Sequence, residues 1–232
     1  MDSYQFHAEI LADDISYFCK VVKDNTNREW LAGVFYGYNN SITDPRFGHG
    51  AFKKVLECKD VDFIASPNEY NRVIGEDWPP QLSVQTVLLH GKMLFAENDT
   101  RTCLTTLLKE KSSEIAPKGE YESGVWIGPE DIQTSLSFLW KNAGRMLAFG
   151  YGGWWFDMWG GWFSNPKMLK IFKLTNEFYK FPLIKDSLMA PEICVVEDEQ
   201  LCFMISSVTS NFCLYEANFG YFLFSSFLFR SR

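Results

Sequence analysis

The feature that most constrains the fold is a regular alternation of short apolar runs with helix-like segments. Four runs have the length and the β-branched and aromatic content of strands buried on both faces, and they cover 31–38, 61–65, 92–96 and 151–156. Strands separated by helices pair in parallel, because each crossover returns the chain to the same end of the sheet. The sequence therefore predicts an α/β fold built on a parallel sheet.

Amphipathic periodicity and capping residues define the predicted helices. Leu11, Ile15, Phe18 and Val22 recur at spacings of four, three and four and predict a helix over about 5–24. Further helices are predicted over 51–60, 129–150 and 166–179. Four strand and helix units suit half of a barrel or a doubly wound sheet, and periodicity alone does not choose between them.

The pattern changes after Ala190, where we predict a domain boundary. An apolar run at 193–196, an acidic turn at 197–199 and a second apolar run at 201–205 suggest the beginning of another α/β domain. The sequence analysis thus divides the chain into 1–190 and 191–232.

Composition and motifs exclude several classes of function. A formal charge of −7 argues against nucleic acid as a partner, since phosphate binding needs clustered Lys and Arg. The six cysteines form no CxxC pair, so no metal site is expected, and neither a GxGxxG nor a GxSxG motif indicates a cofactor or a serine nucleophile. The acidic start lacks the features of a secretory signal, and the apolar run at 219–229 is too short to span a bilayer. We therefore expect a cytoplasmic protein with no membrane partner.

Candidate site residues lie where the predicted strands end, because active sites of parallel α/β folds form at the carboxyl ends of the strands. Glu97 is the candidate catalytic residue, and the candidate substrate-binding residues are Tyr36, Tyr38, Ser66, Tyr70, Trp154, Trp155 and Asp157. Aromatic residues make up 17% of the chain, and aromatic side chains beside a carboxylate suit a carbohydrate ligand.

Structural roles compete with these assignments. Glu97 could cap a helix or pair with Arg101, and Asp157 could cap the loop after its strand. The two tryptophans that end the last strand point to opposite faces, so one of them belongs in a core. His49, in a GHG sequence, is more typical of a loop hydrogen-bond partner than of a catalytic base.

Four segments resemble a known family. LAGVFYGY at 31–38, GHGAFKKVLECKDVDFIASP at 48–67, HGKMLFAENDTRT at 90–102 and WWFDMWGGWF at 154–163 are similar to the later barrel strands of β-galactosidase-like glycoside hydrolases, those of family 42. The segments occur in the order expected for that family, and the resemblance extends over about 5–215.

The resemblance implies a partial (β/α)₈ TIM barrel, in which the four strands are numbers five to eight. Glu97 then matches the catalytic nucleophile at the end of strand seven, and the acid/base after strand four is not part of this chain. The substrate would be a β-galactoside-like or other oligosaccharide. The residues after 190 resemble the start of a flavodoxin-like domain, which in the family is associated with oligomerisation, so a homo-oligomer is expected of the full-length protein.

Three hypotheses follow for function. The chain is a fragment of a retaining glycoside hydrolase, inactive alone. A non-catalytic carbohydrate-binding or assembly module would use the same aromatic residues without chemistry. A gene-model fragment would have no activity of its own.

Overall fold

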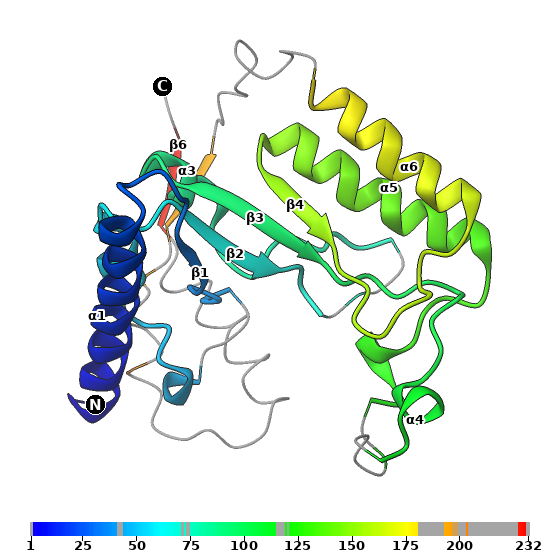
Figure 1. Ribbon diagram of the computed structural model, residues 1–232, viewed down its shortest axis with the longest axis horizontal. Helices are drawn as coiled ribbons and strands as arrows, with labels where there is room; N and C mark the ends of the chain where they lie inside the picture. The colour runs from blue at the N-terminus through cyan, green and yellow to red at the C-terminus, as the bar shows by residue number, and fades with distance from the viewer. Residues whose placement is uncertain are drawn as a thin grey trace. The chain divides into compact units, whose positions relative to one another are not determined.

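The fold contains a four-stranded parallel sheet together with α-helices (Figure 1). The computed structural model describes residues 2–40, 44–70, 72, 75–114, 119, 121–180, 193–196, 198, 203 and 227–230. The strands are β1 (Gly33–Phe35), β2 (Phe63–Pro67), β3 (Met93–Asn98) and β4 (Gly152–Trp155), in the order β1-β2-β3-β4. The predicted α/β class is confirmed, and the ends of each predicted strand lie within three residues of the observed ones.

The long helices also follow the sequence pattern. The α-helices are α1 (Asp2–Asn25), α2 (Phe52–Glu57), α3 (Val84–Leu89), α4 (Leu108–Lys111), α5 (Ile132–Phe149) and α6 (Pro166–Phe178), with 3₁₀ turns η1 (Pro45–Phe47) and η2 (Gly124–Trp126). The short helices α3 and α4 were not predicted. For α3 the sequence holds one signal, Ser83, whose hydroxyl accepts from the Thr86 N–H as an N-cap.

Chain contacts divide the molecule into two compact units. The first comprises Met1–Ile64, Gln81–Met93 and Asp186–Arg232, and the second comprises Ala65–Pro80 and Leu94–Lys185. The first unit carries α1, β1, α2 and α3, and the second carries most of β3 together with α4, α5, β4 and α6.

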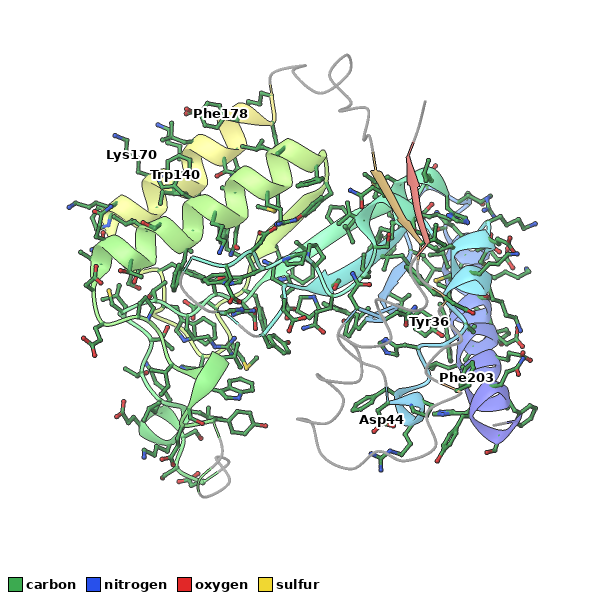
Figure 2. The ribbon with its side chains drawn as sticks, turned by 180° about the vertical axis from the view of Figure 1, so that it is seen from behind. Tyr36, Asp44, Trp140, Lys170, Phe178 and Phe203 are labelled. Atoms are coloured by element: carbon green, nitrogen blue, oxygen red, sulfur yellow. The ribbon has the colours of Figure 1, made fainter. Side chains whose placement is uncertain are left out.

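The first unit contains a buried aromatic cluster around Tyr36, which Figure 2 labels. The Tyr36 hydroxyl donates to the Gly48 carbonyl at 2.7 Å and accepts from the Ala51 N–H at 3.3 Å, while the ring stacks on His49. His49 Nδ1 accepts the Tyr38 N–H at 3.1 Å, and burial lowers the pKa of His49 to about 4. His49 is therefore a neutral loop partner, as the GHG sequence predicts.

In the second unit, α5 and α6 pack side by side (Figure 1). Asp131 caps the start of α5 by accepting the Thr134 N–H at 2.9 Å, and Gly150 ends α5 at a φ of 70°, a left-handed conformation that favours glycine. Met168, from α6 itself, and Trp162, from the loop before α6, pack in one core cluster with buried residues of α5. Trp140 projects outward from α5, as Lys170 does from α6 (Figure 2).

Little of the predicted second domain falls within the described residues. The strand predicted at 193–196 is confirmed as β5 (Ile193–Val196), which pairs antiparallel with β6 (Phe227–Arg230). Apart from Phe203, the run predicted at 201–205 lies outside the described residues. The boundary near 190 and the flavodoxin-like assignment therefore stay predictions.

None of the helices in the described part of the chain is both long and apolar enough to span a membrane.

The tight packing of β4 against its neighbours yields a stability prediction. A Cβ at Gly153 would lie 2.6 Å from both the Ala96 carbonyl oxygen and Met146 Sδ. We expect Gly153→Ala to lower the free energy of unfolding by about 1–3 kcal/mol, because the sheet or α5 must shift. The control is Gly144→Ala in α5, where a Cβ meets no atom within 4 Å, and it should raise stability by up to about 1 kcal/mol. Denaturant unfolding measures both, and a Gly153→Ala variant as stable as wild type would contradict this packing.

Candidate functional site

The candidate site is the region where β3 ends, in the second unit. Along β3, Ala96 and Asn98 are buried, whereas Phe95 and Glu97 are partly exposed. The Asn98 amide nitrogen lies 3.4 Å from Met146 Sδ, so the buried face is the one that α5 covers. The Glu97 side chain, one residue earlier, points to the opposite face.

Trp154 shares that opposite face with Glu97. The register of the parallel β3–β4 pair sets Glu97 against Trp154 and Asn98 against Trp155. Trp155 stacks on Phe172 at a centroid distance of 4.3 Å and so belongs to the core beneath α6. One tryptophan of the pair is therefore structural, as predicted, and Trp154 is the one beside the carboxyl group.

Glu97 is a strongly perturbed acid. Burial is the main cause that raises its pKa to about 7, and the Asp99 carboxylate raises it further, while the Arg101 and Arg72 cations act in the opposite direction. At neutral pH the carboxyl group is therefore close to its midpoint of ionisation.

A fully buried polar segment follows Glu97. Asn98, Asp99, Thr100, Arg101 and Thr102 are each at most 3% exposed. Five consecutive polar side chains are rarely excluded from water, because each needs a partner inside the protein.

Asp99 is the centre of this segment and binds two arginines. Its carboxylate pairs with Arg72 Nη2 through Oδ1 and with Arg101 Nη1 through Oδ2, the latter at 2.6 Å. The Asp99 carbonyl also accepts from Arg72 Nη1 at 3.2 Å and from Arg101 Nη1 at 2.7 Å. The partner of Arg101 is thus Asp99, and the predicted alternative of a Glu97–Arg101 ion pair is wrong.

The neighbours of Asp99 are tethered to other elements of the unit. Asn68 Nδ2 donates to Asn98 Oδ1 at 3.0 Å, and Asn142 Nδ2, from α5, donates to Thr100 Oγ1 at 2.6 Å. The Thr102 hydroxyl donates to the Trp162 carbonyl. The chain after β3 is therefore bound to the loops that follow β2 and β4.

Arg101 is surrounded by tryptophans. Its Cζ lies 4.5 Å from the Trp126 ring centroid, 4.7 Å from that of Trp162 and 6.0 Å from that of Trp159. Such cation–π contacts stabilise a guanidinium that has lost its water. Burial nevertheless lowers the pKa of Arg101, and Asp99 opposes that effect.

Asp157 orders the loop that carries two of these rings. Its carboxylate accepts from the Gly160 N–H at 2.9 Å and from the Trp162 N–H at 3.1 Å. The loop-capping alternative for Asp157 is confirmed.

The remaining predicted residues are distributed over both units. Ser66 lies in β2, fully buried, and Tyr70 is exposed near Arg72, whose Cζ lies 5.3 Å from the Tyr70 ring centroid. Tyr36 and Tyr38 belong to the first unit, where Tyr36 is only 1% exposed. Within the second unit, the structure thus places Trp154 beside Glu97 in strand register and Tyr70 beside the Arg72–Asp99 pair.

Sequence reasoning missed the residues whose charges act on Glu97, which are Arg72, Asp99 and Arg101. It also missed the tryptophans around Arg101, which are Trp126, Trp159 and Trp162. One signal was present: five polar residues, 98–102, follow a buried strand with no glycine or proline to begin a turn. No local pattern indicated Trp126, which comes from η2 and reaches Arg101 only through the tertiary fold.

Within the described residues, Glu97 belongs to no cluster of candidate metal ligands. Among the described residues, no group of three or more His, Cys, Asp or Glu side chains could hold a metal ion. A surface depression of about 650 Å³ lies in the first unit, where Glu9, Lys54 and Asp60 contribute to its lining, and it includes no predicted site residue.

Comparisons of this chain with protein-family models, with curated proteins and with solved structures found no match.

The two-arginine arrangement predicts a large effect of Asp99→Asn. The substitution keeps the shape of the side chain but leaves two buried guanidinium groups without their shared counter-ion, which should cost about 3–5 kcal/mol of unfolding free energy. Glu122→Gln, which breaks the more exposed Lys109–Glu122 pair, is the control and should cost less than about 1 kcal/mol. Denaturant unfolding measures the free energy of unfolding of both variants. Equal losses would show that the Asp99 carboxylate does not hold the two buried arginines together.

The raised pKa of Glu97 predicts a pH-dependent effect of Glu97→Gln. A carboxyl group whose folded pKa is raised stabilises the fold fully below its unfolded value, and that contribution is lost as pH rises through about 7. Glutamine does not titrate, so the variant should gain about 1–2 kcal/mol over wild type between mildly acidic and mildly alkaline pH, allowing for partial exposure. Unfolding curves at both pH values test this, and a pH-independent difference would refute it.

Proposed function

We propose that this chain is the C-terminal half of a retaining glycoside hydrolase barrel, with β1 to β4 as strands five to eight and Glu97 as the nucleophile. The observation that supports the proposal most is the position of Glu97, a half-buried carboxyl at the carboxyl end of β3 with Trp154 beside it in register. The assignment to a β-galactosidase-like family rests on the resemblance of the four sequence segments.

The chemistry of Glu97 is compatible with attack on a sugar. A retaining glycosidase uses one carboxylate to attack the anomeric carbon while a second carboxyl group protonates the leaving oxygen. With a pKa of about 7, a large fraction of Glu97 is ionised at neutral pH and available as a nucleophile. An aromatic face such as that of Trp154 suits the apolar face of a sugar ring.

In this proposal, neither Asp99 nor Asp157 is the acid/base. Asp99 is the carboxylate that most affects the pKa of Glu97, but two arginines bind it and its side chain is 3% exposed. Asp157 accepts two backbone N–H groups. Both carboxylates are therefore occupied with structural partners, which agrees with a chain that supplies one of two catalytic groups.

The first test is turnover. We expect the chain alone to hydrolyse no natural disaccharide, because losing leaving-group protonation costs about 10² to 10⁴-fold. Produced together with the polypeptide encoded directly upstream of Met1, it should gain β-galactosidase-type activity, and Glu97→Gln in that assembly should abolish it. Near-normal rates in the Glu97→Gln assembly would overturn the nucleophile assignment.

Azide rescue distinguishes the nucleophile from an acid/base residue. In the active assembly, Glu97→Ala leaves space for azide to attack the anomeric carbon directly, so a glycosyl azide of inverted configuration is expected. A product of retained configuration would instead assign Glu97 as the acid/base. Asp157→Ala is the control, and azide should not restore any activity that it loses.

Binding without turnover would favour the carbohydrate-binding alternative. In that case, the assembly would bind neutral oligosaccharides and Trp154→Ala would weaken binding, but Glu97→Gln would leave it unchanged. Neither binding nor turnover in the assembly would favour a fragment with no activity of its own.

A further inference from the structure

Two features of the second unit point to a ligand that the proposed glycosidase chemistry does not use. Both concern Arg101, which is 97% buried because only 3% of the residue is exposed. The first feature is geometric and the second is a matter of charge.

The geometric feature is an unpaired edge of the guanidinium. Arg101 Nη1 binds Asp99, but Nε and Nη2 are buried and have no hydrogen-bond partner among the described residues. These two nitrogens form one side of the planar guanidinium, where their N–H bonds are parallel. That side matches the two oxygens of a carboxylate.

The charge feature is an excess of buried positive charge. Arg72 and Arg101 contribute two cations and Asp99 one anion, and the three side chains are 8%, 2% and 3% exposed, respectively. Glu97, the other carboxyl group on which these two cations act, is only about half ionised at neutral pH, so positive charge still exceeds negative charge among the four groups. An unpaired buried charge is costly, so an additional anion would stabilise the site.

Aromatic walls restrict what this anion can be. Trp126 and Trp162 lie within 5 Å of the guanidinium carbon, and Trp126 and Trp159 are themselves partly exposed. Because Nε and Nη2 are buried, a ligand reaches them only when one of the two partly exposed rings moves aside. The ligand then contacts indole, which suits a carboxylate attached to a ring with an apolar face better than a fully hydrated inorganic ion.

We propose that Arg101 binds the carboxylate of an acidic ligand through Nε and Nη2, with Trp126, Trp159 and Trp162 as the walls of the site. We take this acidic ligand to be a uronic acid, which is a sugar that carries a carboxylate. That choice rests on the proposed glycosidase function. The carboxylate site itself depends only on the geometry and charge of the second unit.

The direct test observes the Arg101 Nε–H by NMR in the ¹⁵N-labelled wild-type chain. The probes are sodium glucuronate, glucose as its neutral counterpart, sodium propionate as a carboxylate without a sugar, and inorganic phosphate. The Arg101 signal is identified by its nuclear Overhauser contacts to the indoles of Trp126 and Trp162. We expect glucuronate to shift this signal in a saturable manner and glucose to leave it unchanged.

Variants measure how much the Nε–Nη2 edge of Arg101 contributes to the affinity for glucuronate. Arg101→Lys keeps the positive charge but loses the paired N–H groups, so glucuronate binding followed by tryptophan fluorescence should weaken about tenfold or more. Arg145→Lys is the matched control, because Arg145 pairs with Asp77 in the same unit and not with Asp99. The Arg145→Lys variant should bind glucuronate as tightly as the wild type does. If Arg101→Lys does not fold, the wild-type NMR titration decides alone.

The outcomes separate the site from the proposed function. Equal shifts with propionate and glucuronate would support the carboxylate site while removing its link to sugars. Equal shifts with glucose and glucuronate, tighter binding of phosphate than of either carboxylate, or an Arg101 signal that no carboxylate moves would each overturn the proposal.

Discussion

The buried ion-pair network around Asp99 is the constraint on which the second unit depends. One carboxylate neutralises part of the charge of two guanidinium groups, one from the loop after β2 and one from the segment after β3. A desolvated cation is tolerated only with such a partner, and the cation–π contacts of Arg101 with Trp126 and Trp162 supply further stabilisation. Because these side chains are buried, their positions are set by contacts with the surrounding protein and not by contacts with water.

Glu97 owes its properties to this network and to its strand. Alternation along β3 turns Glu97 away from α5, while Asn98 is turned toward it. Partial burial favours the neutral carboxyl, and the nearby anion and cations partly cancel each other. A small change in the surrounding charge is therefore enough to move Glu97 from mostly protonated to mostly ionised at neutral pH.

The sequence predicted the elements well, because local patterns determine them. The spacing of Leu11, Ile15 and Val22 predicted α1, and Asp131 and Gly150 marked the two ends of α5 through caps that are local in the chain. The position of Glu97 at the end of a predicted strand makes it a candidate. The network was not predicted, since Asp99, Arg72 and Trp126 meet through contacts between distant segments, and no periodicity encodes such contacts.

The buried segment 98–102 has a consequence for how this protein can vary. In many α/β proteins the loops at the ends of the strands change independently, and new specificities arise one loop at a time. Here the loop after β2, the segment after β3 and the loop after β4 share hydrogen bonds through Asn68, Asp99 and Thr102. A change in the length of one loop would leave buried polar groups unpaired in another. These three connections are therefore expected to evolve, and to be engineered, as a single unit.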